Sequence, residues 1–216
     1  MLYFVSDRSG GLGGSDIWVT EWTGMTWGIP ENLGEPINST AAEHLPFIAN
    51  NGQTLYFGSD RPGSYGGRDL YRSDWLGDSW SVPQNLGPTI NTPDEENGPW
   101  VSPQLDLLFF QSWGHGGYGQ VDLFQSTWNG SGWDDVVNVG SPVNTVYREA
   151  GACLTPDMGT LYFHSDRPGG MGSFDLYVSF QQSQGGVARS TACPGSQRTG
   201  QQAFILRIPA DTQLRR

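Results

Sequence analysis

The sequence predicts an all-β protein built as a four-bladed β-propeller, and three observations lead to this prediction. A pattern of large residues recurs every 53 residues along the chain. Glycine and proline account for 31 and 14 of the 216 residues, whereas only 15% of the residues are charged. Short aromatic segments of alternating polarity lie between glycine turns, as in half-buried strands. Four antiparallel strands in about 40 to 50 residues make one propeller blade.

The period keeps one register through most of the chain. Strand starts recur at Leu2, Leu55, Leu108 and Leu161. Further recurring sets are Asp16, Asp69, Asp122 and Asp175; Trp27, Trp80 and Trp133; Asn32, Asn85 and Asn138; and Asn38, Asn91 and Asn144. We therefore predict a single domain over residues 2–213, with repeats at 2–54, 55–107, 108–160 and 161–213. The last repeat loses its markers after residue 179, although residues 204–208 still fall in register.

Each element of a repeat has its own sequence signature, as the second repeat shows. Residues 55–59 alternate in polarity and predict a strand. Residues 60–67 contain the proline and glycines of a tight turn. Residues 69–73 predict the next strand, and residues 80–86 predict an irregular outer strand that contains Pro83. Residues 98–101 predict the innermost strand of the following blade.

The two ends of the chain predict how the ring closes. The first repeat begins at its second strand and lacks an innermost one, while residues 204–208 form an apolar run in the register of an innermost strand. Pairing residues 204–208 with residues 2–6 would close the ring and leave no exposed edge. The alternative is a fragment of a larger ring that ends at a repeat boundary.

Charge and composition exclude several classes of function. The formal net charge is −11, which disfavours nucleic-acid binding through a basic surface. All eleven basic residues are arginine, so Schiff-base and P-loop lysines are excluded. No apolar run approaches the roughly 20 residues that a transmembrane helix needs. We expect a protein that is not transmembrane, and the first residues show no signal peptide.

The repeat resembles the WD40-like propeller repeat of the TolB family. It is more similar still to the longer version in envelope lipoproteins that carry an OmpA-like domain. The shared motifs stand at residues 55–71, 80–92 and 94–99, with the final turn at 155–157. The resemblance covers about residues 2–179 and implies a periplasmic or extracellular-facing location in the cell envelope. An OmpA-like domain and a lipoprotein cysteine are absent from this sequence, so anchoring to peptidoglycan is not implied.

Three recurring glutamates, Glu43, Glu96 and Glu149, each lie just before a predicted innermost strand, with Gln202 in the fourth place and His44 beside the first. Near one mouth of a central channel, these carboxylates would attract a cation such as Ca²⁺ or Mg²⁺. The structural alternative is that each glutamate pairs with a recurring arginine or caps a loop. No other cofactor is expected.

For the other recurring polar residues, we favour a structural role over a functional one. The recurring aspartates flank a glycine loop, and we expect them to accept backbone N–H bonds there rather than to bind metal. Cys153 and Cys193 are predicted to be about 14 Å apart, too far for a disulfide. We therefore expect two free thiols, with Cys153 buried.

The third repeat departs from the others and predicts an exposed patch. Trp113, Gly114 and His115 replace the Asp-Arg-Pro of the second and fourth repeats. With the variable loop residues Tyr65 and Tyr118, Trp113 and His115 are the candidates for a specific surface. Among the other tryptophans, Trp27, Trp80 and Trp133 are expected to pack. Trp75, Trp100 and Trp128 are further candidates for exposure.

These observations favour a non-catalytic binding or scaffold propeller that presents loops to a protein or an envelope polysaccharide. The first alternative is a glycan-active enzyme with carboxylates at the channel mouth. An enzyme needs a unique site, but the only acidic departure from the repeat is Asp134-Asp135, on an outer strand. The second alternative is a fragment of a larger envelope protein.

Overall fold

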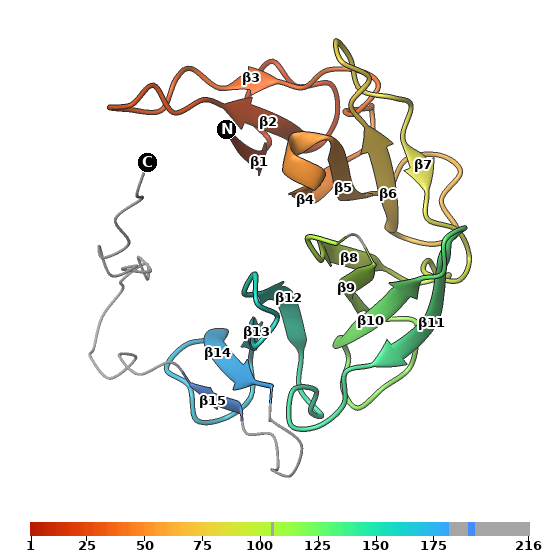
Figure 1. Cartoon of the computed structure of the whole chain (residues 1–216), viewed down its shortest axis with the longest axis vertical. Coiled ribbons are helices and arrows are strands. Elements are labelled where there is room, and N and C mark those ends of the chain that lie inside the picture. Colours follow the sequence, from red (N-terminus) through yellow and green to blue (C-terminus); the bar gives the residue numbers. More distant parts are fainter. Residues whose placement is uncertain (105, 182–189, 193–216) are drawn as a thin grey trace.

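The protein consists of four β-sheets arranged as blades around a common centre (Figure 1). The structure is a computed structural model that describes residues 1–104, 106–181 and 190–192. Within these residues no helix is long and apolar enough to cross a membrane. The sheets confirm the all-β class, and each is an antiparallel meander in chain order.

Blade 1 has three strands and blades 2 to 4 have four each. Blade 1 contains β1 (Leu2–Ser6), β2 (Asp16–Thr20) and β3 (Glu31–Asn32). Blade 2 contains β4 (Glu43–Ala49), β5 (Thr54–Ser59), β6 (Asp69–Asp74) and β7 (Gln84–Asn85), with a 3₁₀ turn at Asn50–Gly52. Blade 3 contains β8 (Glu96–Val101), β9 (Leu107–Ser112), β10 (Asp122–Trp128) and β11 (Trp133–Asn138). Blade 4 contains β12 (Glu149–Leu154), β13 (Thr160–Ser165), β14 (Asp175–Phe180) and β15 (Ser190–Ala192).

A buried polar network explains why one aspartate and two asparagines recur. In blade 2, the Asp69 carboxylate accepts hydrogen bonds from two loop N–H groups and from Asn85 Nδ2. Asn91 accepts from the Leu70 N–H through Oδ1 at 2.8 Å and donates to the Leu70 carbonyl through Nδ2 at 3.0 Å. The side chain of Asn91 thus replaces a strand partner, which satisfies buried backbone groups. Blades 1 and 3 repeat this network. The predicted structural role of these aspartates is therefore confirmed.

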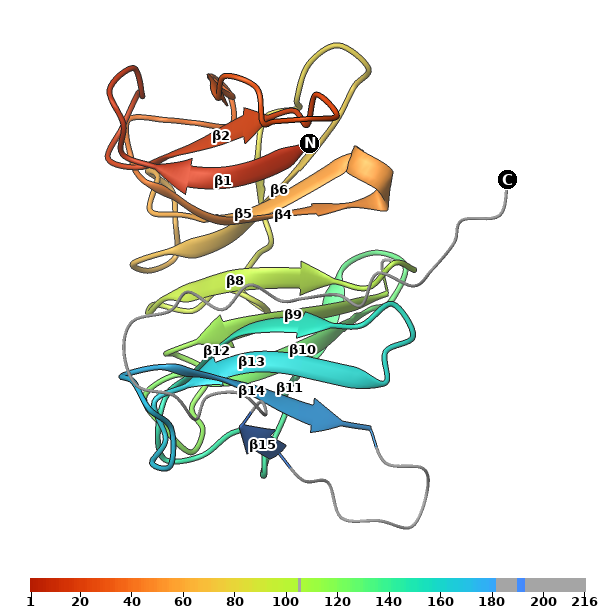
Figure 2. The same cartoon turned by 90° about the vertical axis from the view of Figure 1, so that its left-hand side faces the viewer.

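The topology places two kinds of connection on opposite faces of the ring. Strands β1, β5, β9 and β13 are equivalent, as are β2, β6, β10 and β14. The loops that join them, such as β1–β2 and β9–β10, lie on one face of the ring, on the left in Figure 2. We call this the hairpin-loop face. The turns that follow β4, β8 and β12 lie on the other face. Residues 33–42, 86–95 and 139–148, which link one blade to the next, begin and end on the hairpin-loop face.

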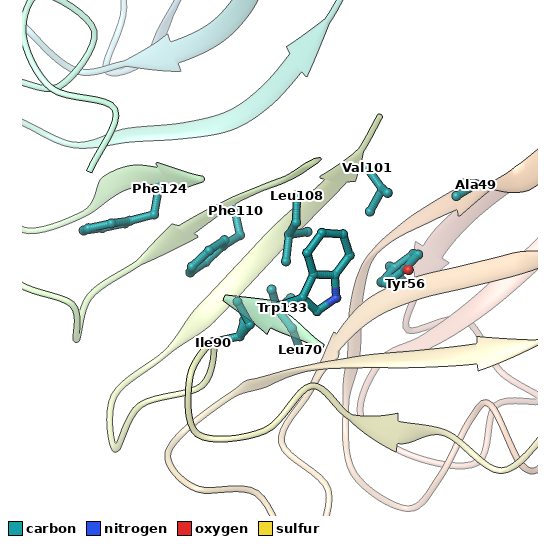
Figure 3. Packing of buried hydrophobic residues seen from close by; sticks show 9 residues of the cluster. All are labelled: Ala49, Tyr56, Leu70, Ile90, Val101, Leu108, Phe110, Phe124 and Trp133. Carbon is teal, nitrogen blue, oxygen red and sulfur yellow. The ribbon is translucent and has the colours of Figure 1, made fainter. Parts of the chain in front are cut away.

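Apolar side chains fill the interface between successive blades. Between blades 2 and 3, Trp133 packs with Tyr56, Leu70 and Ile90 from one side and with Leu108 from the other (Figure 3). Trp133 also meets Trp128 edge to face, with ring centroids 5.4 Å apart. Trp75 and Trp80 form an equivalent pair, and Trp80 packs against blade 1. Each of these tryptophan pairs therefore packs against the preceding blade.

The ends of the chain confirm one prediction and correct another. Blade 1 lacks an innermost strand within the described residues, as predicted. In blade 4, Tyr177 pairs with Ala192, whereas Tyr71 pairs with Asn85 in blade 2. The fourth outer strand is thus displaced by one residue from the position that the 53-residue period predicts. Residues 204–208 and Gln202 lie outside the described residues, so ring closure remains a prediction.

Cys153 is exposed, and the prediction that it is buried is wrong. The equivalent residues Phe47 and Trp100 pack against the next blade, but no blade follows blade 4 in the described part of the chain. Cys153 is a free thiol, and Cys193 lies outside that part.

In a Cys193→Ser background, we expect iodoacetamide to label Cys153 in the folded protein. Partial burial raises the pKa of the Cys153 thiol, so less thiolate is present at a given pH than for a free cysteine. The labelling rate should therefore rise with pH up to a value above the usual thiol range. Mass spectrometry measures the rate, and full protection under native conditions would show that another segment covers this side of blade 4.

Candidate functional site

Three of the four blades hold an arginine between two aromatic rings on the hairpin-loop face. In blade 2, the guanidinium carbon of Arg61 lies 5.1 Å from the Phe57 ring centroid and 5.0 Å from that of Tyr71. Arg61 donates to the Ile37 carbonyl at 2.6 Å and to the Glu43 carboxylate at 3.1 Å. Arg167 in blade 4 and Arg8 in blade 1 occupy the same position over their own ring pairs. These cation–π contacts lock the loop onto its blade.

Blade 3 departs from this arrangement, because His115 takes the place of the arginine. Its imidazole lies 5.6 Å from the Phe110 ring and 5.3 Å from the Phe124 ring, centroid to centroid. Nε2 of His115 donates to the Ile90 carbonyl at 2.8 Å, the acceptor equivalent to that of Arg61. A carbonyl oxygen can only accept, so Nε2 carries a proton in this bond.

A pocket of about 420 Å³, which we call the third-blade pocket, lies beside His115. Its lining residues are His115, Gly116, Gly117, Tyr118, Phe124, Val136 and Asn138. In blade 2, Ser64 and Tyr71 meet at the equivalent place through their hydroxyl groups, 3.0 Å apart. Gly117 and Phe124 lack both hydroxyls, so this space stays open in blade 3. A lining that combines Phe124 and Val136 with an imidazole suits a planar ring or an apolar side chain.

The residues predicted for an exposed patch lie on the same face of the ring. Trp113, Tyr65 and Tyr118 are 42%, 52% and 55% exposed, while His115 is half-buried in the pocket wall. The linker at residues 92–95 joins two of the loops, because Trp113 N–H donates to the Glu95 carbonyl and Gly67 N–H to the Asp94 carbonyl. The other proposed exposed tryptophans differ: Trp100 is buried, and Trp75 and Trp128 are half-buried in their tryptophan pairs.

The recurring glutamates are fully buried, so their predicted place at an open channel mouth is corrected. Glu43 accepts hydrogen bonds from Ser39 N–H and Oγ, from Ser59 Oγ and from Arg61. Glu149 repeats this arrangement with Arg167. These contacts match the structural alternative given above, in which each glutamate pairs with a recurring arginine or caps a loop. In the described residues, Glu43 and Glu149 thus use their carboxylate oxygens in hydrogen bonds to the protein's own donors.

Glu96 is the exception, because blade 3 has no arginine in its loop. Its carboxylate accepts from Thr92 N–H at 2.6 Å, Thr92 Oγ1 at 2.8 Å and Ser112 Oγ at 2.6 Å. Among the described residues, Glu96 has no ion-pair partner within 4.0 Å. His44 is half-buried on β4, where burial and the nearby Arg68 lower its pKa. Residues 1–104, 106–181 and 190–192 contain no cluster of three acidic, histidine or cysteine side chains that could hold a metal ion.

The centre of the ring is apolar rather than acidic. A cavity of about 340 Å³ lies between β1, β4, β8 and β12, and none of its lining residues is charged. Its walls include Tyr3, Phe4, Leu45 and Pro99. A bulge interrupts each innermost strand beside this cavity, so Leu45, Gly98 and Gly151 all have positive φ. The carboxylates therefore point away from the channel into the loops.

Sequence reasoning did not recognise that Trp22, Trp75 and Trp128 recur at the 53-residue period. They pair with Trp27, Trp80 and Trp133, respectively. The period itself was the signal that could have identified them. Ser39, Thr92 and Thr145 also recur four residues before the glutamates, which is the spacing of the observed side-chain bonds.

Comparisons with known proteins identify the fold but not a family. By sequence, no protein-family model matches the chain, and no curated protein is significantly similar to it. Among solved structures, TolB from Acinetobacter baumannii is similar, with a TM-score of 0.58, 14% identity, and coverage of 88% of this chain and 40% of that protein. A putative TolB from Agrobacterium tumefaciens has a TM-score of 0.55 and 18% identity, and the match covers 87% of this chain and 59% of the other.

A puromycin-hydrolyzing peptidase from Mycobacterium tuberculosis is similar over 88% of this chain and 30% of its own, with a TM-score of 0.50 and 12% identity. The chain thus spans between about a third and three fifths of these proteins. Nothing in these comparisons supports the closer resemblance to OmpA-like lipoproteins. At these identities the likeness shows the fold alone: the chain has a TolB-like β-propeller fold.

Proposed function

We propose that this protein is a non-catalytic binding module whose partner engages the hairpin-loop face at the third-blade pocket. The observation that carries the proposal is the departure of blade 3 from the other blades at His115, Gly117 and Phe124, which line a pocket there. The recurring residues hold the blades rigid, and a rigid scaffold with one distinctive loop is the usual arrangement of a binding site. The exposed rings of Trp113 and Tyr118 beside the pocket offer stacking surface to a ligand.

The partner that this surface suits is a protein side chain or a sugar ring of an envelope polysaccharide. Both present a flat apolar face with polar groups at its edge, which matches a lining that combines the apolar Phe124 and Val136 with the imidazole of His115. The resemblance of the repeat to TolB favours a periplasmic or envelope location. The alternative hypothesis, a glycan-active enzyme, requires solvent-exposed carboxylates at the channel mouth. Because the recurring glutamates are buried and the central cavity is apolar, no observation favours that alternative.

A loop exchange tests the proposal. The variant Trp113→Asp, Gly114→Arg, His115→Pro rebuilds the Asp-Arg-Pro of blade 2 and should replace the imidazole and the Trp113 ring by a guanidinium group paired to Glu96. We expect oligomers of N-acetylglucosamine or capped aromatic amino acids to bind the wild-type protein, as seen by ligand-observed NMR. Binding should weaken at least about tenfold in the variant, because the stacking surface is lost.

The matched control is Tyr65→Ala, which removes an exposed loop tyrosine from blade 2 and should change binding to the third-blade pocket much less. Circular dichroism checks that the exchanged loop leaves the sheets intact. Equal binding by the wild type and the loop-exchange variant, or no binding of either probe class at millimolar concentration, would refute the proposal.

A further inference from the structure

The interface between blades 3 and 4 contains an open groove of about 390 Å³ on its outer side, which we call the blade 3–4 groove. Its apolar walls come from both blades and include Phe109, Val139, Leu154, Leu161 and Phe180. Phe180 at the rim is 54% exposed. Between blades 2 and 3, a smaller pocket of about 180 Å³ is bordered by Trp128 and Trp133 and shares with the groove the equivalent positions Arg72, Leu86 and Trp128.

The walls of the groove match the surroundings of the tryptophan pair in the neighbouring interface. Trp133 and Trp128 pack with a cluster that includes Tyr56, Leu86 and Val101. Moved on by one period, these positions become the groove residues Phe109, Val139 and Leu154. Gln125 of the groove corresponds in the same way to Arg72, which borders the filled site. The same apolar site is therefore present twice, once filled by two indoles and once without them.

Blade 4 has no tryptophan to place in this groove. The last tryptophan of the whole sequence is Trp133, and Gln181 stands where Trp128 and Trp75 stand in blades 3 and 2. The backbone of Gln181 is positioned like theirs, because its N–H donates to the Gly159 carbonyl as Trp128 N–H donates to Asp106. The groove continues the apolar interface that joins blades 3 and 4. At the position of Trp128, the described residues of blade 4 thus keep the backbone arrangement and lack the indole.

We propose that the blade 3–4 groove is a second binding site, on the edge of the ring, for a tryptophan-bearing β-hairpin turn of a partner polypeptide. The partner's indole pair would complete the blade interface as Trp128 and Trp133 do between blades 2 and 3. Indole side chains suit this role, since they bury a large apolar area at a small entropic cost and dominate many interfaces. The groove-lining residues are uncharged, so the apolar contact carries the recognition.

The probe for this site is a cyclic peptide that carries residues 127–134 (TWNGSGWD), the hairpin turn that fills the equivalent site. We expect it to bind the full chain in isothermal titration calorimetry. Replacing both tryptophans of the peptide by alanine should weaken binding at least about tenfold. Gln181→Trp should place an indole in the groove from within and abolish peptide binding. Phe180→Asp, which puts a charge at the rim, should weaken binding if Gln181→Trp does not fold.

Tyr118→Ala serves as the control, because Tyr118 lies at the third-blade pocket and should leave peptide binding unchanged. Three results would overturn the proposal: no binding of the peptide at millimolar concentration, equal binding of the alanine peptide, or full binding by both groove variants. Sedimentation velocity tests whether the occupant is a second copy of this chain. If the wild type is a dimer and Trp22→Ala makes it monomeric, the occupant is a second copy and not a separate partner. Its exposed Trp22–Trp27 pair would then be the occupant.

Discussion

Glu43→Gln should lower the free energy of unfolding by about 3 to 5 kcal/mol, because it breaks a buried ion pair and leaves Arg61 without its carboxylate. The Glu43 side chain has no exposed surface, and the Arg61 side chain is only 13% exposed. The new amide would also point a donor at groups that are already donors, namely Ser39 and Ser59. Urea unfolding followed by tryptophan fluorescence measures the change.

The matched comparison for Glu43→Gln is Glu96→Gln in blade 3. Glu96 is equally buried and accepts bonds from Thr92 and Ser112, but the described residues give it no arginine partner. We expect Glu96→Gln to cost only about 1 to 2 kcal/mol, the range for losing hydrogen bonds alone. Equal losses in the two variants would contradict the role assigned to the arginine. Stabilisation by either variant would show that the carboxylate is kept for a different purpose.

Asn91→Ala should lower the free energy of unfolding by about 2 to 4 kcal/mol. Asn91 is 2% exposed, and its amide satisfies both the N–H and the carbonyl of Leu70. Truncation leaves two buried backbone groups without partners, at a cost of about 1 to 3 kcal/mol each before relaxation or entry of water. The exposed Gln84→Ala is the control and should change the unfolding free energy by less than about 0.5 kcal/mol. A loss for Asn91→Ala no larger than that of the control would mean that water replaces the amide.

The repeating part of the fold could be predicted from the sequence because each marker has a local partner. Asp69, Asn85 and Asn91 bond within one blade and its linker, so their spacing is fixed by the blade and repeats with it. The same reasoning fails where the partner lies in a different blade. Cys153 was expected to be buried because it lies on an innermost strand, but the blade that would cover Cys153 is not among the described residues.

The sequence predicted which repeat carries the candidate site but not how its residues are arranged. The substitution of Trp113, Gly114 and His115 marked the third repeat as unusual. Its consequence depends on the Ile90 carbonyl, which a linker from the preceding blade brings to the imidazole. The glutamates were misplaced for a similar reason: the linker folds back over each carboxylate, and no property of an isolated strand shows this. Recurrence alone could not separate a channel lining from a buried cap.

The most direct test of the account is to map where a probe binds on the wild-type protein. Amide ¹H–¹⁵N spectra recorded during titration with the strongest-binding N-acetylglucosamine oligomer or capped aromatic amino acid give this map. We predict shifts concentrated at residues 113–119 and at Phe124, with the equivalent loops at 60–66 and 166–172 nearly unchanged. Shifts of similar size in all of these loops, or shifts confined to the residues around the central cavity, would contradict the assignment of the third-blade pocket as the binding site.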